Sequence, residues 1–379
     1  MSEYTIDNVL RIAKRHNNAK RSYLLVNPLQ AKHMPVKPSQ ALEMMHCLGE
    51  NLYKKYPATK LVVGFAETAT AIGAAVAECF DDDCIYIHTT REEVEEVKDW
   101  ILFLEEHSHA AEQKLSRDNF EKWISNTKSI IFVDDELSTG KTLINMINQL
   151  RAQFPALSDV QMIAASIMNR LTKENEDRLL SEGIVSEYLV KLPDEDYTAL
   201  VENIQTAPAT DLTKEEVVPH NYEKLVPHKA FLDPRVGMEI AEYKNNCKAV
   251  CEKVVESLIT KISDNDSVLV LGTEECMYPA IILGETLEKL HKGNVVCHAT
   301  TRSPIGICKS EGYPIYEGYL INSFYESDRN TFVYNLKNYD AVVVVSDTLT
   351  DYENALNNVA MALDSYGFGK LFYLGGKNA

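Results

Sequence analysis

Two adjacent acids, Asp134 and Asp135, separate an apolar run from a short polar segment. The stretch 130–143 reads IIFVDDELSTGKTL, and its hydroxyl side chains belong to Ser138, Thr139 and Thr142. Loop amides and a helix N-terminus can hold a phosphate, and Gly140 would let the backbone approach it closely. The carboxylates would hold sugar hydroxyls or order Mg²⁺ through its water shell, because that ion favours carboxylate and phosphate oxygens. The pattern therefore predicts a phosphate site with acids beside it.

A nucleotide-hydrolysing P-loop is a competing interpretation of the same segment. Residues 135–142, DELSTGKT, end like the motif G-x-x-x-x-G-K-[ST]. However, Asp135 stands where that motif has its first glycine. A carboxylate there would disturb the tight turn and repel phosphates, so this interpretation fits less well.

Alternating strand-like and helix-like segments surround the two acids. We expect strands at 23–26, 61–64, 84–88, 130–134 and 161–167. We expect helices at 40–56, 70–79, 92–115 and 142–154. This alternation predicts an α/β fold, with a parallel sheet covered by helices on both faces. Ligands of such sheets bind at the carboxyl ends of the strands, where the two acids would lie.

Three landmarks of the first half recur in the second half in the same order. LVVGFAET resembles VLVLGTEE, HTTR resembles HATTR, and IIFVDDELSTGKTL resembles VVVVSDTLTDYENAL. The spacings between matched residues are 208, 211 and 212. Near-constant spacing predicts a second α/β domain that is a degenerate copy of the first, although any two strand–turn–helix units are somewhat alike.

The segment around the two acids resembles the signature of type I phosphoribosyltransferases. That signature is a strand, two acids, an apolar pair and Thr-Thr-Gly-x-Thr; Glu136 departs from it. The resemblance implies that Asp134 and Asp135 bind ribose hydroxyls and, through water, Mg²⁺, while residues 138–142 bind the 5′-phosphate. It also implies that the turn 64–69 holds the pyrophosphate of the donor, phosphoribosyl pyrophosphate. The expected donor-binding residues are Ala66, Glu67, Thr68, Asp134, Asp135, Glu136, Leu137, Ser138, Thr139, Gly140, Lys141 and Thr142.

The resemblance suggests further roles outside the donor site. Arg91 would join Asp134 and Asp135 as a catalytic residue, because it could stabilise the departing pyrophosphate. The expected acceptor-binding residues are Lys32, His33, Glu105, His107 and His109. Each of these side chains could equally belong to a solvated loop or helix end.

Several phrases together resemble a narrower family, the phosphoribosyltransferases encoded with tellurite-resistance genes. They are NPLQAKHMPV, HTTRE, LEEHSHA and VDDELSTGKT. Members carry a C-terminal domain named for a Thr-Arg-Ser-Pro motif, present here at 301–304. We expect a phosphoribosyltransferase domain at 1–202, a linker at 203–233 and a TRSP-type domain at 234–379. The resemblance implies synthesis of a nucleoside-like metabolite beside other enzymes of one pathway.

The second half has lost the phosphate loop. Tyr352 and Asp351 stand where the first half has Gly140 and Thr139. A bulky ring and an acid cannot form an anion site, so we expect no phosphoribosyl pyrophosphate there. The residues expected to form a second-domain site are Glu274, Glu275, Thr301, Arg302 and Ser303. They would bind an acceptor or second ligand, or the domain would only complete the first site.

Composition excludes several classes of protein. The 379 residues carry a formal net charge of −18, which argues against a general nucleic-acid binder. No apolar run approaches the roughly 20 residues that span a membrane. The start, MSEYTIDNVLRIAKRH, lacks an apolar signal core, so we expect a cytoplasmic protein. The sequence leaves open whether the protein forms a homodimer.

The function expected from sequence is therefore transfer of a phosphoribosyl group, with Mg²⁺, to a base-like small-molecule acceptor. Three alternatives stay open. They are a donor-binding regulator without turnover, a phosphoribosyl pyrophosphate synthetase, and a scaffold in a biosynthetic complex. Synthetases of that kind also pair two such folds, but they carry the intact loop in the second half.

Overall fold

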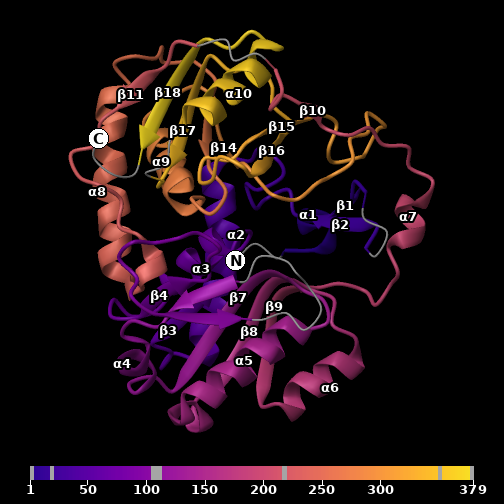
Figure 1. The fold of residues 1–379 in the computed structure, drawn as a ribbon, viewed down its shortest axis with the longest axis vertical. Helices are drawn as coiled ribbons and strands as arrows, with labels where there is room; N and C mark the ends of the chain where they lie inside the picture. Colours follow the sequence, from indigo (N-terminus) through magenta and orange to yellow (C-terminus); the bar gives the residue numbers. More distant parts are fainter. Residues whose placement is uncertain (1–3, 18–20, 104–112, 216–219, 349–351, 376–379) are drawn as a thin grey trace. The chain divides into compact units, whose positions relative to one another are not determined.

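The computed structural model describes residues 4–17, 21–103, 113–215, 220–348 and 352–375 (Figure 1). The chain forms two compact units, and each is built from separate segments of the sequence. The first unit comprises residues 1–6, 43–194 and 232–245. The second unit comprises residues 7–42, 195–231 and 246–379. Both units have the expected α/β architecture with parallel strands.

The first unit contains a six-stranded sheet in the order β12-β4-β3-β7-β8-β9. Its strands are β3 (Leu61–Gly64), β4 (Ile85–His88), β7 (Ser129–Leu137), β8 (Gln161–Asn169), β9 (Ile184–Lys191) and β12 (Met238–Glu239). All neighbours are parallel except β12, which pairs antiparallel with β4. The central strands are continuous apolar runs because helices cover both of their faces. Gly64 pairs with both His88 and Val133, so β3 and β4 end level with the point where β7 reaches its acids.

Helices of the first unit pack on this sheet according to their apolar faces. They are α3 (Thr70–Ala77), α4 (Phe120–Ile124), α5 (Lys141–Gln153) and α6 (Lys173–Ser181), with α2 (Pro38–Lys55) starting in the second unit. The helix α3 is buried along its whole length, whereas α5 buries only one stripe that includes Ile147 and Leu150. Figure 1 shows α5 and α6 beside β8 and β9. A 3₁₀ turn, Pro155–Asp159, follows α5.

The helix expected at 92–115 is wrong. The structure instead has two strands, β5 (Trp100–Phe103) and β6 (Gln113–Ser116), which pair antiparallel. The charged run EEVEEVK at 92–98 suggested a helix because its residues favour that state. Cross-strand pairing of Ile101 with Leu115 and burial of both overrides this local preference.

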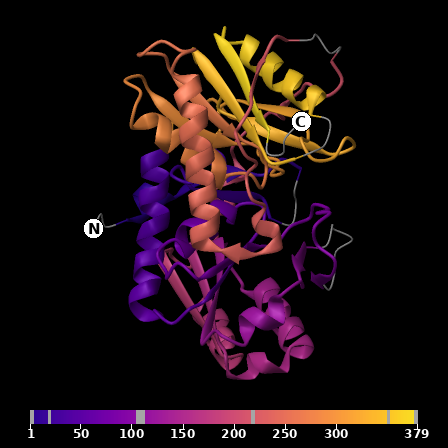
Figure 2. The same cartoon turned by 90° about the vertical axis from the view of Figure 1, so that its left-hand side faces the viewer.

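The second unit contains a five-stranded parallel sheet in the order β11-β18-β17-β13-β14. Its strands are β11 (Glu223–Leu225), β13 (Val268–Gly272), β14 (Val295–Ala299), β17 (Ala341–Ser346) and β18 (Lys370–Gly375). A smaller sheet holds β10 (Thr210–Asp211), β15 (Gly318–Asn322) and β16 (Asn330–Tyr334). The helices are α9 (Tyr278–Glu288) and α10 (Glu353–Asp364), with the later part of α8 (Ile240–Leu258). In Figure 2, α10 lies against the yellow strands near the C-terminus, and Val359 and Leu363 belong to the buried core there.

Four strands of each sheet have the same order and direction. The first unit has β4-β3-β7-β8, and the second has β14-β13-β17-β18. Equivalent hydrogen bonds recur: Thr89 N–H donates to Gly64 O at 2.9 Å, and Thr300 N–H donates to Gly272 O at 3.0 Å. In both units an antiparallel strand pair separates the second and third of these strands in the sequence. The expected second α/β domain is confirmed, and it shares this four-strand topology with the first unit, as a copy would.

The expected domain boundaries differ from the observed units. The N-terminal strands β1 (Arg11–Lys14) and β2 (Tyr23–Val26) belong to the second unit. Their side chains pack with residues distant in sequence, as Val26 does with Ile305 and Tyr334. The expected linker, 203–233, is also part of the second unit except for its last two residues, because β10 pairs with β15 and β11 with β18. Local pattern does not encode such long-range pairing.

The remaining elements are short. They are α1 (Ile6–Val9), α7 (Thr198–Glu202) and the 3₁₀ turn Pro234–Val236. Within the described ranges, no helix has the length and apolar character needed to cross a membrane.

Candidate active site

The connection between β7 and α5 forms the centre of the site. Gly140 precedes α5 with a φ of 68°, in the left-handed region that glycine adopts without steric cost. A Cβ added at this position would lie 3.1 Å from Leu179 Cδ1. Arg178 Nη2 donates to Thr139 O at 2.7 Å, so α6 holds the loop through this hydrogen bond. The first amides of α5 have no partner within the helix and can bind an anion.

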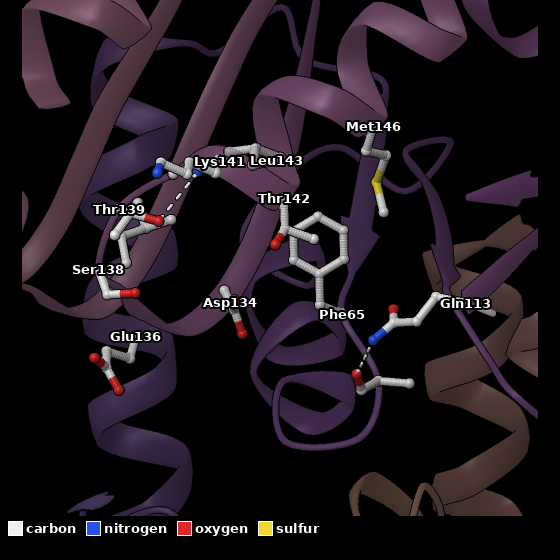
Figure 3. Close-up of a pocket in the computed structure, with 13 residues that line it drawn as sticks. Phe65, Gln113, Asp134, Glu136, Ser138, Thr139, Lys141, Thr142, Leu143 and Met146 are labelled. Carbon is white, nitrogen blue, oxygen red and sulfur yellow. Dashed lines mark hydrogen bonds between the residues drawn. The ribbon is translucent and has the colours of Figure 1, made fainter. Parts of the chain in front are cut away.

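A pocket opens at this connection (Figure 3). Its lining consists of Phe65, Ala66, Gln113, Asp134, Glu136, Leu137, Ser138, Thr139, Gly140, Lys141, Thr142, Leu143 and Met146. Figure 3 shows the hydroxyl side chains of Ser138 and Thr142 around the same opening as the Asp134 carboxylate. This arrangement suits a phosphorylated sugar. The hydroxyls and helix amides can donate to its phosphate, and the carboxylates can accept from its hydroxyls.

The two adjacent acids are held in a crowded arrangement. Asp135 N–H donates to Asp134 Oδ1 at 2.9 Å, and Thr68 Oγ1 donates to Asp135 Oδ1 at 2.9 Å. Burial and the neighbouring charge of Asp135 raise the pKa of Asp134 well above its ordinary value. A pair of this kind gains from a ligand that supplies hydroxyl donors or a divalent cation.

Glu136 adds a third acid to the end of β7. Its Oε1 lies 3.8 Å from Arg170 Nη1, and both side chains are largely buried. Arg170 follows β8 directly, so adjacent strands position the two charges. The arginine thus offsets the acid that stands where the type I signature has an apolar residue.

Hydrogen bonds fix the turn after β3 beside this loop. Ala66 N–H donates to Thr89 Oγ1 at 3.0 Å, and Thr89 Oγ1 donates to Gln113 Oε1 at 2.6 Å. Gln113 Nε2 donates to Ala66 O at 2.9 Å (Figure 3). The peptide bond between Ala66 and Glu67 is cis. Two segments distant in sequence, those that carry Thr89 and Gln113, therefore position the turn at 64–69.

The structure brings most of the expected donor-binding residues together. Ala66, Asp134 and residues 136–142 line the pocket. Thr68 donates a hydrogen bond to Asp135, which lies between the lining residues Asp134 and Glu136 in the chain. Gln113 and Met146 also line the pocket, and Arg178 supports its loop, but sequence reasoning missed all three because no local pattern marks them.

The other expected site residues either do not line this pocket or fall outside the described residues. Arg91 follows β4 in an exposed position and is not among the described residues that line the pocket. Glu105, His107 and His109 fall in 104–112, outside the described residues. Lys32 and His33 are buried in the second unit, where Lys32 Nζ donates to Glu274 O at 2.8 Å. They fall within the stretch 7–42 that belongs to the second compact unit, so their contact with the acceptor stays a prediction.

The residues expected to form a second-domain site do lie together. Arg302 Nε is 2.7 Å from Glu274 Oε2, and Arg302 Nη2 is 3.8 Å from Glu275 Oε1. Ser303 N–H donates to Thr301 Oγ1 at 3.2 Å. These groups follow β13 and β14, at the edge equivalent to that of the first unit's pocket.

Comparison with protein families gives two adjacent matches. Residues 9–187 match the model of a phosphoribosyl transferase, and residues 233–363 match the TRSP domain found C-terminal to that transferase. The chain therefore belongs to the phosphoribosyltransferases with a C-terminal TRSP domain, within the pentosyltransferase class of enzymes. The resemblance drawn from the sequence is confirmed. No curated protein matches the chain.

Solved structures show weaker similarity. Adenine phosphoribosyl transferase from Trypanosoma brucei is 16% identical, with a TM-score of 0.31, covering 41% of this chain and 68% of its own. Orotate phosphoribosyltransferase from Aeropyrum pernix is 15% identical, with a TM-score of 0.32 and coverages of 52% and 92%. The adenine enzyme from Giardia lamblia is 12% identical, with a TM-score of 0.35 and coverages of 48% and 94%. TM-scores this low do not support a conclusion about function.

Proposed function

We propose that the first unit transfers the phosphoribosyl group of phosphoribosyl pyrophosphate to a base-like acceptor. The observation that carries this proposal is the connection between β7 and α5. There Asp134 and the loop at 138–142 line one pocket, with Gly140 in a left-handed conformation, and Asp135 follows Asp134 in the same strand. Asp134 and Asp135 would bind the ribose hydroxyls, and residues 138–142 would bind the 5′-phosphate. The turn at 64–69 would hold the pyrophosphate through its amides.

The donor set also fits Mg²⁺. Among the described residues, no three His, Cys, Asp or Glu side chains form a metal-binding group. Mg²⁺ is usually held by one or two carboxylates together with substrate phosphates, so a complete protein site is not required. Asp134 and Asp135 would hold the ion through water, and it would neutralise charge on the bound pyrophosphate. The raised pKa of Asp134 reflects a cost that a bound cation would reduce.

The proposed reaction needs positioning more than a protein nucleophile. The bond between C1 of ribose and the pyrophosphate oxygen breaks, and C1 forms a bond to an acceptor nitrogen, which loses its proton to solvent. Fixed donors around the leaving group would stabilise the negative charge that develops on it. Arg91 stays in this proposal as a cation near the leaving pyrophosphate. Glu105, His107 and His109 stay as candidates for contact with the acceptor.

The family resemblance suggests where this reaction belongs. A phosphoribosyl group joined to a base-like acceptor yields a nucleotide, so the proposed product is the precursor of a nucleoside-like metabolite. We place this synthesis in the stress response linked to tellurite resistance, beside other enzymes of the same pathway.

Calorimetric titration of phosphoribosyl pyrophosphate with Mg²⁺ tests the donor site. The variants are the double change Asp134→Asn, Asp135→Asn and the control Asp347→Asn at the equivalent position of the second unit. We expect one donor per chain for the wild type and at least a tenfold loss for the double variant, because Asn cannot bind the diol as a charged acceptor. The control should bind as the wild type does. Binding that the double variant retains would contradict the proposed site.

Pyrophosphate release with purine and pyrimidine bases then tests turnover. Release that depends on one base identifies the acceptor class. Donor binding without release for any base would favour the regulator. Formation of the donor from ATP and ribose 5-phosphate would favour the synthetase.

A further inference from the structure

The second unit contains a group of buried charges that the proposed transferase site does not use. Glu274 is fully buried at the end of β13, and its carboxylate accepts from three side chains. Arg302 Nε approaches Oε2 at 2.7 Å and Arg329 Nη2 approaches the same oxygen at 3.3 Å. Ser323 Oγ donates to Oε1 at 2.5 Å. One buried carboxylate therefore holds two guanidinium groups side by side.

Folding stability alone is a poor explanation for this arrangement. Buried ion pairs lose about as much through desolvation as they gain, and apolar replacements are often neutral or better. The backbone of Glu274 adds a further cost, because its φ of 45° is in the left-handed region that residues other than glycine rarely adopt. Strained residues of this kind concentrate at functional sites.

The position in the fold is one where ligands bind. Glu274 follows β13, and Arg302 follows β14 as Arg91 follows β4 in the first unit. Glu274 N–H donates to Thr300 Oγ1 at 2.9 Å, as Ala66 N–H does to Thr89 Oγ1. This is the carboxyl edge of a parallel sheet, where α/β proteins place their ligands.

The imidazole of the residue after Lys32 provides a second, independent observation. His33 is 2% exposed, and neither ring nitrogen has a hydrogen-bond partner among the described residues. It follows Lys32, whose ammonium donates to the carbonyl of Glu274. Burial and the charges of Lys32 and His298 lower the pKa of His33 to about 3, so the ring is neutral at pH 7. A buried ring without partners is costly unless water or a ligand contacts it.

The groups of the cluster that reach solvent are its arginines. Side-chain exposure is 15% for Arg302 and 20% for Arg329, whereas Glu274 has none. The neighbouring acids are engaged: Glu275 Oε1 lies 3.8 Å from Arg302 Nη2, Glu326 pairs with Arg329, and Asp347 accepts from the Tyr325 hydroxyl. An incoming ligand would thus meet guanidinium groups, whose planar forks match phosphate and carboxylate oxygens.

We infer that Arg302 and Arg329, held by Glu274, form an oxyanion site of the TRSP unit for the phosphate or carboxylate group of a small ligand. This site is separate from the proposed donor site and does not depend on it. The ligand is not phosphoribosyl pyrophosphate. Ser346 replaces the first diol-binding acid, and Tyr352 replaces the loop glycine.

Calorimetric titrations with inorganic phosphate and with succinate test the inference on the full chain. Arg329→Gln is the main variant, and Arg302→Lys keeps the charge but removes the fork. Arg11→Gln, an exposed arginine of the same unit, is the control. Gly140→Ala is added to each of these variants to identify phosphate bound at the loop of the first unit. A wrong assignment of one site can then be distinguished from a wrong assignment of the other. Circular dichroism verifies that every variant is folded.

We expect at least a tenfold loss of anion binding in Arg329→Gln, a smaller loss in Arg302→Lys and none in Arg11→Gln. Loss confined to phosphate identifies a phosphorylated ligand, and loss confined to succinate identifies a carboxylate. If Arg329→Gln does not fold, Arg302→Lys carries the test alone. Isotherms for both anions that neither folded arginine variant changes would overturn the inference.

Discussion

The connection from β7 to α5 and the connection from β17 to α10 occupy the same place in equivalent sheets. Gly140 directly precedes α5 in a left-handed conformation, whereas Tyr352 precedes α10 and stacks on Tyr373, with ring centroids 4.0 Å apart. Asp134 has Ser346 as its counterpart. The first connection lines a pocket, whereas in the second the residue equivalent to Gly140 packs its ring on Tyr373.

The turns after β3 and β13 show the reverse contrast, because here the second unit carries the charged side chain. Ala66 has no polar side chain, and its turn is held by Thr89 and Gln113. Glu274 stands at the equivalent position and binds two arginines. Within one topology, binding capacity thus depends on the residues at a few strand ends, because the sheet itself only places them.

The largest expected effect comes from Glu274→Ala. Removal of the carboxylate leaves two partly buried guanidinium groups unpaired, so the free energy of unfolding should fall by about 3–5 kcal/mol. Denaturant unfolding measures this change. As a control, Glu326→Ala removes the exposed partner of the same Arg329 and should cost no more than about 1 kcal/mol. Equal losses in the free energy of unfolding would show that the buried ion pair contributes no more than the exposed one.

A smaller effect is expected from Gly140→Ala. The left-handed conformation costs other residues about 1–2 kcal/mol, and the added Cβ presses on Leu179, so donor affinity should fall about tenfold. Gly183→Ala is the matched control, because its φ is 69° and it lies outside the pocket. It should lower stability and leave donor affinity unchanged in calorimetry.

The reciprocal change, Tyr352→Gly, sharpens the comparison of the two connections. It should create no donor site, because Ser346 lacks the carboxylate that Asp134 supplies. A second Mg²⁺-dependent donor site in this variant would show that the loop residue alone decides binding.

The smallest expected change in stability is a gain from Asp134→Asn. The raised pKa of Asp134 means that ionisation costs the folded state more than the unfolded state. This cost is absent below the ordinary pKa of aspartate and grows as pH rises toward the raised value. At pH 7 the variant should therefore unfold about 2–4 °C higher, as for about 1 kcal/mol in a domain of this size. Thermal unfolding at pH 4 and pH 7 checks the sign: the gain should shrink at pH 4.

The candidate site was largely predictable because its chemistry is local in the sequence. Asp134, Gly140 and Thr142 lie within one strand–loop–helix segment, and Ala66 lies in a turn that the repeat had marked. Gln113 was not predictable, because its role depends on a hydrogen bond to a residue 47 positions away. The helix expected at 92–115 failed for a related reason, since cross-strand pairing outweighed the local preference of charged residues.

The sequence by itself determined the α/β alternation around the candidate site, the repeated landmarks of the two halves and the pattern that predicts a phosphate site. Each of these follows from short-range patterns of apolar, acidic and glycine residues. Only the tertiary structure decided that residues 7–42 pack with the C-terminal half, and that Lys32 meets Glu274. Such contacts join residues more than two hundred positions apart, and they form because the fold buries both partners at one sheet edge.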